Sequence, residues 1–313
     1  MKFFLKKTFA FLFLFFIGMV VIYLSSGYVA QNKLLRKGRA VVIDKSRRLQ
    51  ALQSPKIVLV GGSNVCYGID AKLLQDSLHM PVVDMSINAG VGMSFYYEQV
   101  KPFITKDDIV IGIPEYGAYS QIEMNGDESL YNLCVIQSVN YKYFNFKQWL
   151  SFPLHLGDVT KSNLKSLFAN PSTDNANGRK LYNEYGSYLG HINKPSLSKQ
   201  WAASEKKENF KYTSNQVINY AFIKLIKDFN EFCKLKQVIY LHSVPVYAKP
   251  YYDSLYISSL FQSLNGVSII NKPEQYLYEM EEMFDTPNHI LYKVREARTK
   301  KLLEDIKKAL LKK

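Results

Sequence analysis

A run of four apolar residues, Ile57-Val58-Leu59-Val60, leads directly into Gly61-Gly62-Ser63-Asn64. An unbroken apolar run is typical of a strand that is buried on both faces, as in a parallel sheet covered by helices. The two glycines allow a sharp turn where the strand ends. Because ligands bind at the carboxyl ends of strands in open α/β sheets, Ser63 is predicted to lie at the edge of a site. The alternative is that residues 61–64 form only a turn.

Short apolar runs alternate with helical patterns along most of the remaining chain. Strands are expected at residues 56–60, 81–85, 108–113, 237–241 and 266–270. Helices are expected at residues 69–78, 94–103, 215–235, 253–264, 272–283 and 291–311, with Asp70 capping the first of them. This alternation predicts an α/β fold with about five parallel strands.

The N-terminal segment carries no charge from Thr8 to Asn32. About 20 such residues are enough to cross the hydrocarbon core as a helix. We therefore predict a cytoplasmic stub and a transmembrane anchor within residues 1–32, with a signal peptide cleaved near Ser25 or Gly27 as the alternative. Basic residues flank the anchor on both sides, so the charge count does not set its orientation. We expect an extracytoplasmic domain because long domains translocate largely regardless of charge.

Residues 33–54 are basic and predict a juxtamembrane helix or linker that could lie against anionic headgroups. The whole chain carries a formal net charge of +13, from 40 Lys and Arg against 27 Asp and Glu. This excess suggests affinity for anionic surfaces. The lysines are scattered and no nucleic-acid-binding module is present, so a nucleic-acid partner is not expected.

Residues 55–313 are expected to form one α/β domain, interrupted at residues 117–213 by a stretch rich in Tyr, Asn, Ser and Lys. A loop of that length implies an inserted subdomain, and short helices are expected near residues 147–149 and 161–168. Its polar and aromatic centre, residues 182–186 with His191, could bind carbohydrate or could be ordinary loop filler.

Cysteine spacing predicts neither a metal site nor a complete set of intrachain disulfides, because Cys66, Cys134 and Cys233 are odd in number and widely spaced. We expect no cofactor. Cys66 lies three residues after Ser63, so it is either an alternative nucleophile or a small buried residue.

A polar group follows each predicted strand: Ser63, the Asn88/Gly90 loop, Glu115, His242 and the Asp285/His289 turn. Nucleophilic acyl chemistry needs a hydroxyl, a histidine that takes its proton, and an acid that orients the histidine. Ser63, His289 and Asp285 could supply these three groups. Oxyanion donors could come from the backbone of Ser63 or Gly90, or from the side chain of Asn64 or Asn88. Each residue taken alone could instead be a cap or a turn residue.

Three short blocks resemble those of the SGNH/GDSL hydrolase superfamily. They are Gly61-Gly62-Ser63-Asn64, the segment from Asp84 to Gly92, and the segment from Asp285 to His289. The resemblance covers residues 56–116 and 237–313. It implies a flavodoxin-like, three-layer α/β/α domain in which Ser63 is the nucleophile, Gly90 binds the oxyanion, and Asp285 and His289 are the acid and base.

The membrane-anchored layout resembles the branch that acts in cell-surface polysaccharide assembly, such as the alginate O-acetyltransferase-like proteins. That resemblance implies an extracytoplasmic domain and an acylated glycan or acyl donor as substrate. Other polysaccharide-assembly proteins are candidate partners.

Three positions depart from the superfamily pattern. Gly62 stands where an aspartate is usual, and Glu115 stands where an asparagine normally donates to the oxyanion. An ionised carboxylate cannot donate a hydrogen bond. Three residues separate Asp285 from His289 where two are usual, so Glu281 or Glu282 could replace Asp285.

These features predict a serine-dependent acyl-ester enzyme, either an O-acyltransferase or an esterase, acting on a surface polysaccharide. The alternative is a catalytically inactive protein of the same fold that binds glycan or scaffolds a polysaccharide machine. A phosphate cradle at residues 61–64 is a third reading, although the P-loop and dinucleotide-binding patterns are absent.

Overall fold

A computed structural model describes residues 1–119, 124–168, 174–197, 200–201, 203 and 217–312. It contains a parallel sheet of four strands in the order β2-β1-β3-β4. The strands are β1 (Ile57–Gly61), β2 (Val82–Asp84), β3 (Ile109–Ile113) and β4 (Ile239–His242). The α/β fold is therefore confirmed.

The segment predicted as a fifth strand is reduced to one bridge, in which Ile269 pairs with His242 in the parallel sense. Two backbone hydrogen bonds hold this segment beside β4, from His242 to Ser268 and from Ile270 to His242. A second sheet contains only β5 (Tyr247–Ala248) and β6 (Leu277–Tyr278). The predicted helix at residues 272–283 is wrong, because β6 and two 3-10 turns, Pro273–Tyr276 and Met280–Glu282, occupy that segment.

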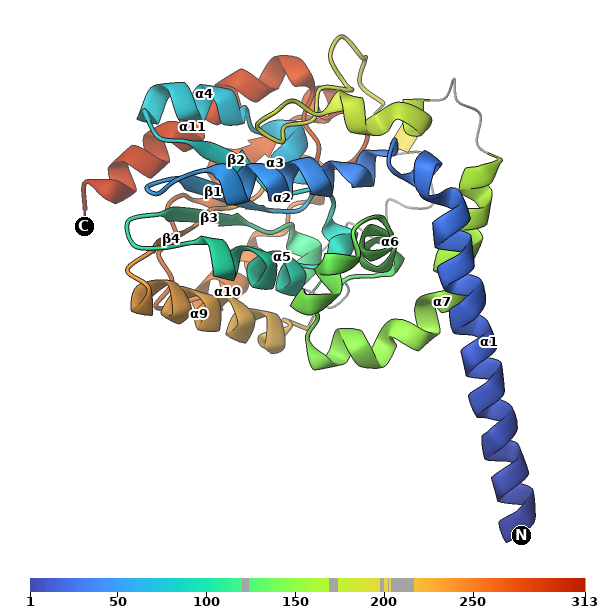
Figure 1. Cartoon of the computed structure of the whole chain (residues 1–313). Coiled ribbons are helices and arrows are strands. Elements are labelled where there is room, and N and C mark those ends of the chain that lie inside the picture. The colour runs from blue at the N-terminus through green and yellow to red at the C-terminus, as the bar shows by residue number, and fades with distance from the viewer. Residues whose placement is uncertain (120–123, 169–173, 198–199, 202, 204–216, 313) are drawn as a thin grey trace.

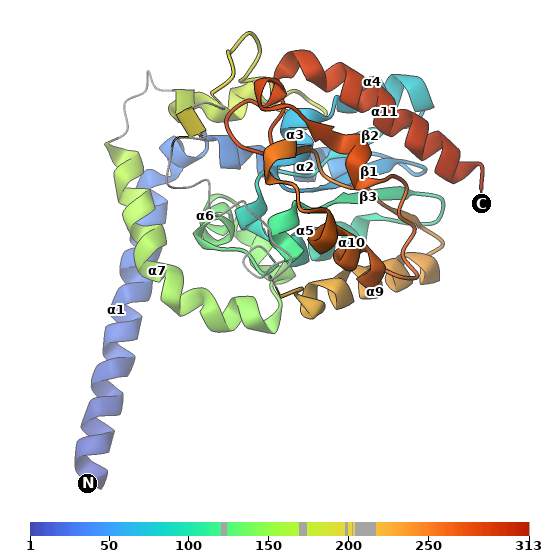
Figure 2. The same ribbon diagram turned by 180° about the vertical axis from the view of Figure 1, so that it is seen from behind.

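Helices cover both faces of the four-stranded sheet (Figures 1 and 2). Val58 and Val60 of β1 face a core formed with α2 (Val41–Ala51), α5 (Met93–Val100), α9 (Tyr220–Leu235) and α10 (Ser254–Ser263). Ile57 and Leu59 face α3 (Ser63–Gly68), α4 (Ala71–Leu78) and α11 (Tyr292–Leu310). This alternation follows from the period of two along a strand. Asp70 caps α4 as predicted, accepting hydrogen bonds from the amides of Lys72 and Leu73.

Helix α1 (Lys2–Leu34) projects from the domain and, by its length and composition, is apolar enough to cross a membrane. Its outer part exposes large apolar side chains to the surroundings. Its inner part buries Tyr23, Ser26, Gly27, Ala30 and Leu34. The chain then turns into α2, whose Val42 and Leu49 lie in the main core. Residues 41–51, part of the segment predicted as a juxtamembrane helix or linker, are thus helical and pack against the core of the α/β fold.

The described part of residues 117–213 is mainly helical. It contains α6 (Glu128–Ile136), α7 (Phe146–Leu167) and the 3-10 segments Ser138–Tyr143 and Asp174–Leu181. The two short helices predicted near residues 147–149 and 161–168 are the ends of the single helix α7, which continues through Pro153. Residues 120–123, 169–173, 198–199, 202 and 204–213 of this stretch lie outside the described residues. That the stretch is a separate subdomain stays a prediction.

Candidate functional site

The turn after β1 places Ser63 at the first position of α3, with Gly62 as the residue before the helix. Ser63 is half-buried, and its Oγ donates a hydrogen bond to Oε1 of Glu115 at 3.1 Å. The amide of Asn64 donates to the same carboxylate oxygen at 3.0 Å. Glu115 follows β3, the strand beside β1, and only 5% of its surface is exposed. A buried carboxylate therefore holds the serine hydroxyl and the start of its helix.

Gly62 makes room for Glu115. A Cβ atom at position 62 would lie 2.4 Å from Oε1 and 2.8 Å from Cδ of Glu115, closer than van der Waals contact allows. An aspartate at this position would add a second negative charge beside the first. The glycine at position 62 and the glutamate at position 115 are thus sterically linked.

Asp285 and His289 lie in a tight turn that is closed by the antiparallel bridge between Met283 and Ile290. The turn brings Nδ1 of His289 to 2.6 Å from Oδ1 of Asp285, so Asp285 contacts the histidine despite the longer spacing. Tyr67 stacks on the imidazole, with ring centroids 4.2 Å apart and planes within 5°. The hydrogen bond and the stacked ring together fix the orientation of His289.

Opposing effects act on the His289 imidazole. Burial disfavours its charged form, but the charge and hydrogen bond of Asp285 and the charge of Glu115 outweigh burial and raise the pKa of His289 above 6.5. Burial likewise opposes ionisation of Asp285, and its contact with His289 nevertheless keeps the pKa of Asp285 below 3.8. The contact with Asp285 therefore stabilises the imidazolium form of His289 relative to a histidine without an acidic partner.

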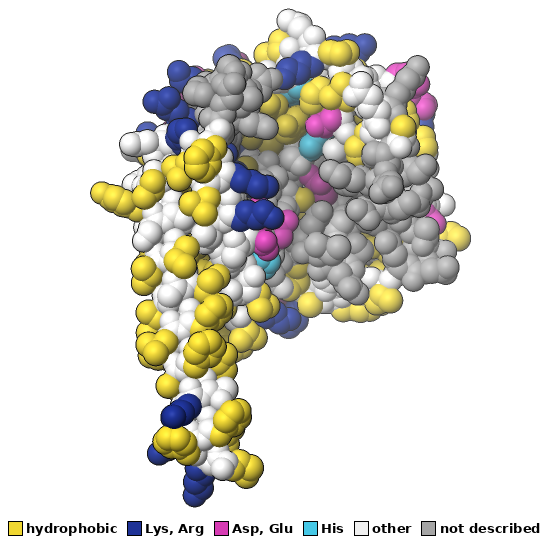
Figure 3. All heavy atoms as spheres, turned by 90° about the vertical axis from the view of Figure 1, so that its right-hand side faces the viewer, with side chains coloured by type: hydrophobic (Ala, Val, Ile, Leu, Met, Phe, Trp, Pro, Cys, Tyr) yellow, Lys and Arg dark blue, Asp and Glu magenta, His cyan; other side chains and the backbone are white. Residues whose placement is uncertain are grey.

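Ser63 and His289 line one cavity of about 450 Å³. Among the described residues no hydrogen bond joins Ser63 Oγ to His289, because the hydroxyl is turned to Glu115. The space-filling view shows this side of the molecule hollowed beside the upper part of α1, with histidine and acidic side chains in the hollow (Figure 3). The cavity walls come from seven segments and also include Leu34, Lys37, Arg39, Tyr67, Asn88, Asn132, Ser162, Ser166 and Tyr182.

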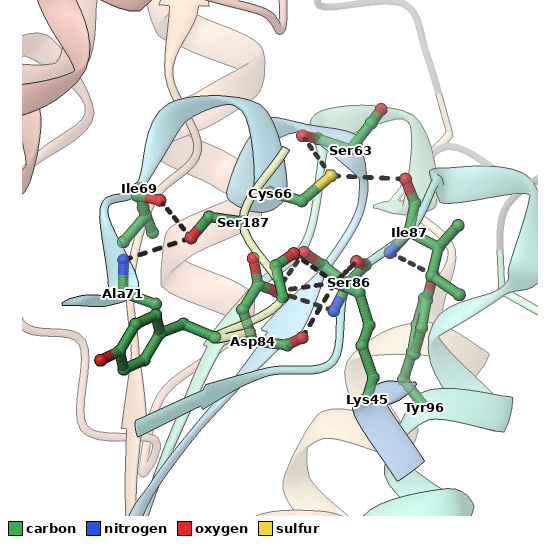
Figure 4. A network of polar contacts seen from close by, with 12 residues as sticks. Lys45, Ser63, Cys66, Ile69, Ala71, Asp84, Ser86, Ile87, Tyr96 and Ser187 are labelled. Atoms are coloured by element: carbon green, nitrogen blue, oxygen red, sulfur yellow. Dashed lines mark hydrogen bonds and ion pairs between the residues drawn. The ribbon is translucent and has the colours of Figure 1, made fainter. Parts of the chain in front are cut away.

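The loop after β2 forms another wall and is held by a buried lysine (Figure 4). Lys45 of α2 donates to the carbonyl oxygens of Asp84 at 2.9 Å, Gly186 at 2.7 Å and Ser86. The Asp84 carboxylate lies 3.8 Å from the Lys45 ammonium and accepts from the Ser86 amide at 2.8 Å. Burial raises the pKa of Asp84, although Lys45 and Ser86 act in the opposite direction. This network sets the path of the chain toward Asn88.

The predicted oxyanion donors are not equally placed. Asn88 lines the cavity, and its side-chain oxygen has no hydrogen-bond partner among the described residues. Asn64 is fully buried, and its amide points to the carbonyl of Ile113 at 3.4 Å. Gly90 packs against Asp127, the residue that caps α6. Asn88 and the amide of Ser63 at the helix start are thus the candidate donors nearest the cavity.

His242 lies apart from the cavity, in the core between two tyrosine hydroxyls. Its Nε2 is 2.7 Å from the hydroxyl of Tyr119 and its Nδ1 is 3.1 Å from that of Tyr240. Burial lowers the pKa of His242 to about 3, so the ring is neutral at physiological pH. Its described contacts are those of a core residue.

Cys66 is fully buried below Ser63, and burial raises the pKa of its thiol to about 12. Its Sγ lies 3.4 Å from the carbonyl of Ser63. Since the thiolate is the reactive form, this environment suits a structural cysteine and not a nucleophile. His191 is also fully buried, among aromatic rings that include Tyr67 and Phe284.

Tyr67, Lys37 and Arg39 line the cavity but were not predicted as site residues from the sequence. Tyr67 could have been found, because it follows Ser63 by four residues and so shares its helix face. Lys37 and Arg39 gave no such signal, since the fold alone brings their segment to the cavity. Burial, helped by the charge of Arg39, lowers the pKa of Lys37. Both basic residues face the space beside Ser63.

Comparison with protein-family models gives no match, and comparison with curated proteins gives no significant match.

Replacing Asp285 with asparagine is expected to lower the pKa of His289. The substitution removes the negative charge that favours imidazolium and leaves burial, which favours the neutral ring. A pH titration of the histidine ring protons by NMR would measure the change, with His289→Gln assigning the signal. Asp76→Asn removes an exposed carboxylate on α4 and is the control. It should leave the pKa of His289 unchanged. An unchanged His289 titration in Asp285→Asn would contradict the role given to this pair.

Proposed function

We propose that this chain is a membrane-anchored, SGNH-like serine acyl-ester enzyme, an O-acyltransferase or esterase, that acts on a cell-surface polysaccharide from the extracytoplasmic side. The observation that carries the proposal is that Ser63 and His289 line one cavity, and that Asp285 contacts Nδ1 of that histidine. A hydroxyl beside an acid-oriented histidine is the arrangement that acyl transfer requires. Lys37 and Arg39 in the same wall favour a negatively charged glycan or acyl donor.

In the proposed reaction, Ser63 Oγ attacks the carbonyl carbon of the ester and its proton passes to Nε2 of His289. Asp285 holds Nδ1 and stabilises the imidazolium. The Ser63 amide and Asn88 donate to the oxyanion. The proton then moves from His289 to the departing alcohol oxygen as the ester bond breaks. A sugar hydroxyl or water then attacks the acyl-serine, and His289 takes the proton of that incoming group. The bond between the acyl group and Ser63 Oγ breaks, and His289 returns the proton to Oγ.

One observation favours a second function, that of a non-catalytic glycan-binding or scaffold protein. Ser63 Oγ is engaged by Glu115 and makes no hydrogen bond to His289 in the described contacts. For catalysis the hydroxyl must turn from Glu115 toward the histidine. In a binding protein the Ser63–Glu115 hydrogen bond would be permanent, and the cavity would hold a sugar without reacting.

Covalent labelling distinguishes the two functions. The full chain in detergent would be treated with a fluorophosphonate probe, and the modified peptide would be identified by mass spectrometry. The enzyme hypothesis expects labelling of Ser63 in the folded protein and loss of labelling in His289→Gln, because the neutral imidazole is the base that activates the serine. If the folded protein is not labelled at Ser63, the enzyme hypothesis is refuted and the non-catalytic binding or scaffold function is supported.

A further inference from the structure

The first half of α7 carries an uncovered apolar face. Phe146, Trp149, Leu150 and Leu154 are 80%, 48%, 68% and 80% exposed. Their spacing places them along one side of a helix. On the opposite side, Gln148 is fully buried and donates to the carbonyl of Asn125 at 2.8 Å. The helix thus attaches to the domain by its polar side and presents its apolar side outward.

This apolar face lies at the end of the domain from which α1 projects. Helix α7 contains Pro153, and Figure 1 shows it bending, with its second half running along α1. The first half crosses the lower edge of the domain and is directed away from α1; the reverse view agrees (Figure 2). A membrane crossed by the projecting part of α1 would therefore lie against the first half of α7.

Aromatic rings join α7 to α1 at the level of Tyr23. The Tyr23 ring packs edge-on against Phe152 at 5.5 Å, and its hydroxyl bonds to that of Tyr141. Trp149 in turn stacks on Tyr141 at 5.8 Å. Tryptophan and tyrosine are enriched where a membrane protein meets the interface. Between Lys7 and Tyr23, α1 has 15 residues without charge, which is about 22 Å of helix, and the long side chains of Lys6 and Lys7 can reach the opposite interface.

We infer that residues 146–154 of α7 lie in the membrane interface beside α1, with Phe146, Trp149, Leu150 and Leu154 inserted at the boundary between headgroups and acyl chains. The bilayer is the occupant that the structure favours, because the apolar surface continues from α1 through the aromatic rings to α7. Lys147 is exposed on the same segment and can contact anionic headgroups. The inference does not depend on the enzymatic proposal.

Spin-label accessibility in nanodiscs would test this placement on the full chain. A nitroxide would be attached at Leu150→Cys or at Leu235→Cys, one label per protein. The native cysteines, Cys66, Cys134 and Cys233, are buried, which favours labelling at the introduced thiol. Leu235 is a matched control, because it is also an exposed leucine on a helix, at 87%, and ends α9 far from the anchor in sequence.

The label at position 150 is expected to be several-fold more accessible to oxygen than to a water-soluble nickel chelate, relative to the label at 235. Equal accessibility of the two labels to the nickel chelate would overturn the placement, since position 150 would then be in water. Strong dipolar broadening between labels at position 150 would also overturn it, because a second copy of the chain would then cover this face. Leu154→Cys provides an independent second site if Leu150→Cys does not fold.

Discussion

Replacement of Ser63 by alanine is expected to reduce turnover of an activated ester by roughly 10⁴-fold to 10⁶-fold, because the acyl-enzyme can no longer form. The loss should appear in kcat, since Ser63 forms a covalent bond to the acyl group only during the proposed reaction. Steady-state kinetics on the full chain in detergent would measure it. The protein should remain folded, because Ser63 contributes one side-chain hydrogen bond, to Glu115.

Ser162→Ala is the matched control for this experiment. Ser162 lines the same cavity but belongs to α7 and takes no part in the proposed steps. We expect its effect on kcat to be small beside that of Ser63→Ala. Equal turnover in wild type and Ser63→Ala, with both folded, would refute a serine nucleophile at this position.

Replacement of Lys45 by methionine is expected to give the largest loss of stability. The Lys45 side chain is 1% exposed, and its ammonium serves three backbone carbonyls and faces the buried Asp84 carboxylate. Methionine keeps most of the volume but leaves these acceptors without a donor. Removing one partner of a buried ion pair costs about 3–5 kcal/mol, so the free energy of unfolding should fall by that amount. Thermal or denaturant unfolding would measure it.

The control for Lys45→Met is Lys72→Met on α4. Lys72 also pairs with an aspartate, Asp76, but both side chains are more than half exposed. Solvent screens such a pair, so the substitution should change stability little. Similar unfolding curves for Lys45→Met and Lys72→Met would show that the Lys45 network does not hold the loop after β2.

Continuous apolar runs predicted the strands of the large sheet well. The runs that became β1 and β3 are buried on both faces, and only a parallel sheet covered by helices accommodates them. The helix predicted at residues 272–283 was wrong, because Leu277 and Tyr278 form a short strand that pairs with β5. The pattern of apolar residues in so short a segment does not distinguish a helix from a strand. The single helix α7 was missed because Pro153 normally ends a helix, whereas here packing against α1 favours its continuation.

Part of the candidate site could also be predicted from the sequence. Ser63, Asn88 and His289 follow strands or end a turn, and the structure brings all three to one cavity. Local patterns could not show that Glu115 reaches Ser63, because that contact depends on the register between β1 and β3. Local sequence patterns also could not place Lys37 and Arg39 at the cavity. The pattern of apolar residues does not show that the chain after α1 folds back onto the site.

Helix α1 runs without a break from the level of Tyr23 to Leu34, and Leu34 is part of the cavity wall. At 1.5 Å per residue, this stretch is about 16 Å long. With the membrane interface at Tyr23, as inferred above, the helix fixes the height of Leu34 and its cavity wall above the lipid, which a flexible tether would leave variable. A substrate attached to the same membrane must extend to that height to bring its reacting group to Ser63.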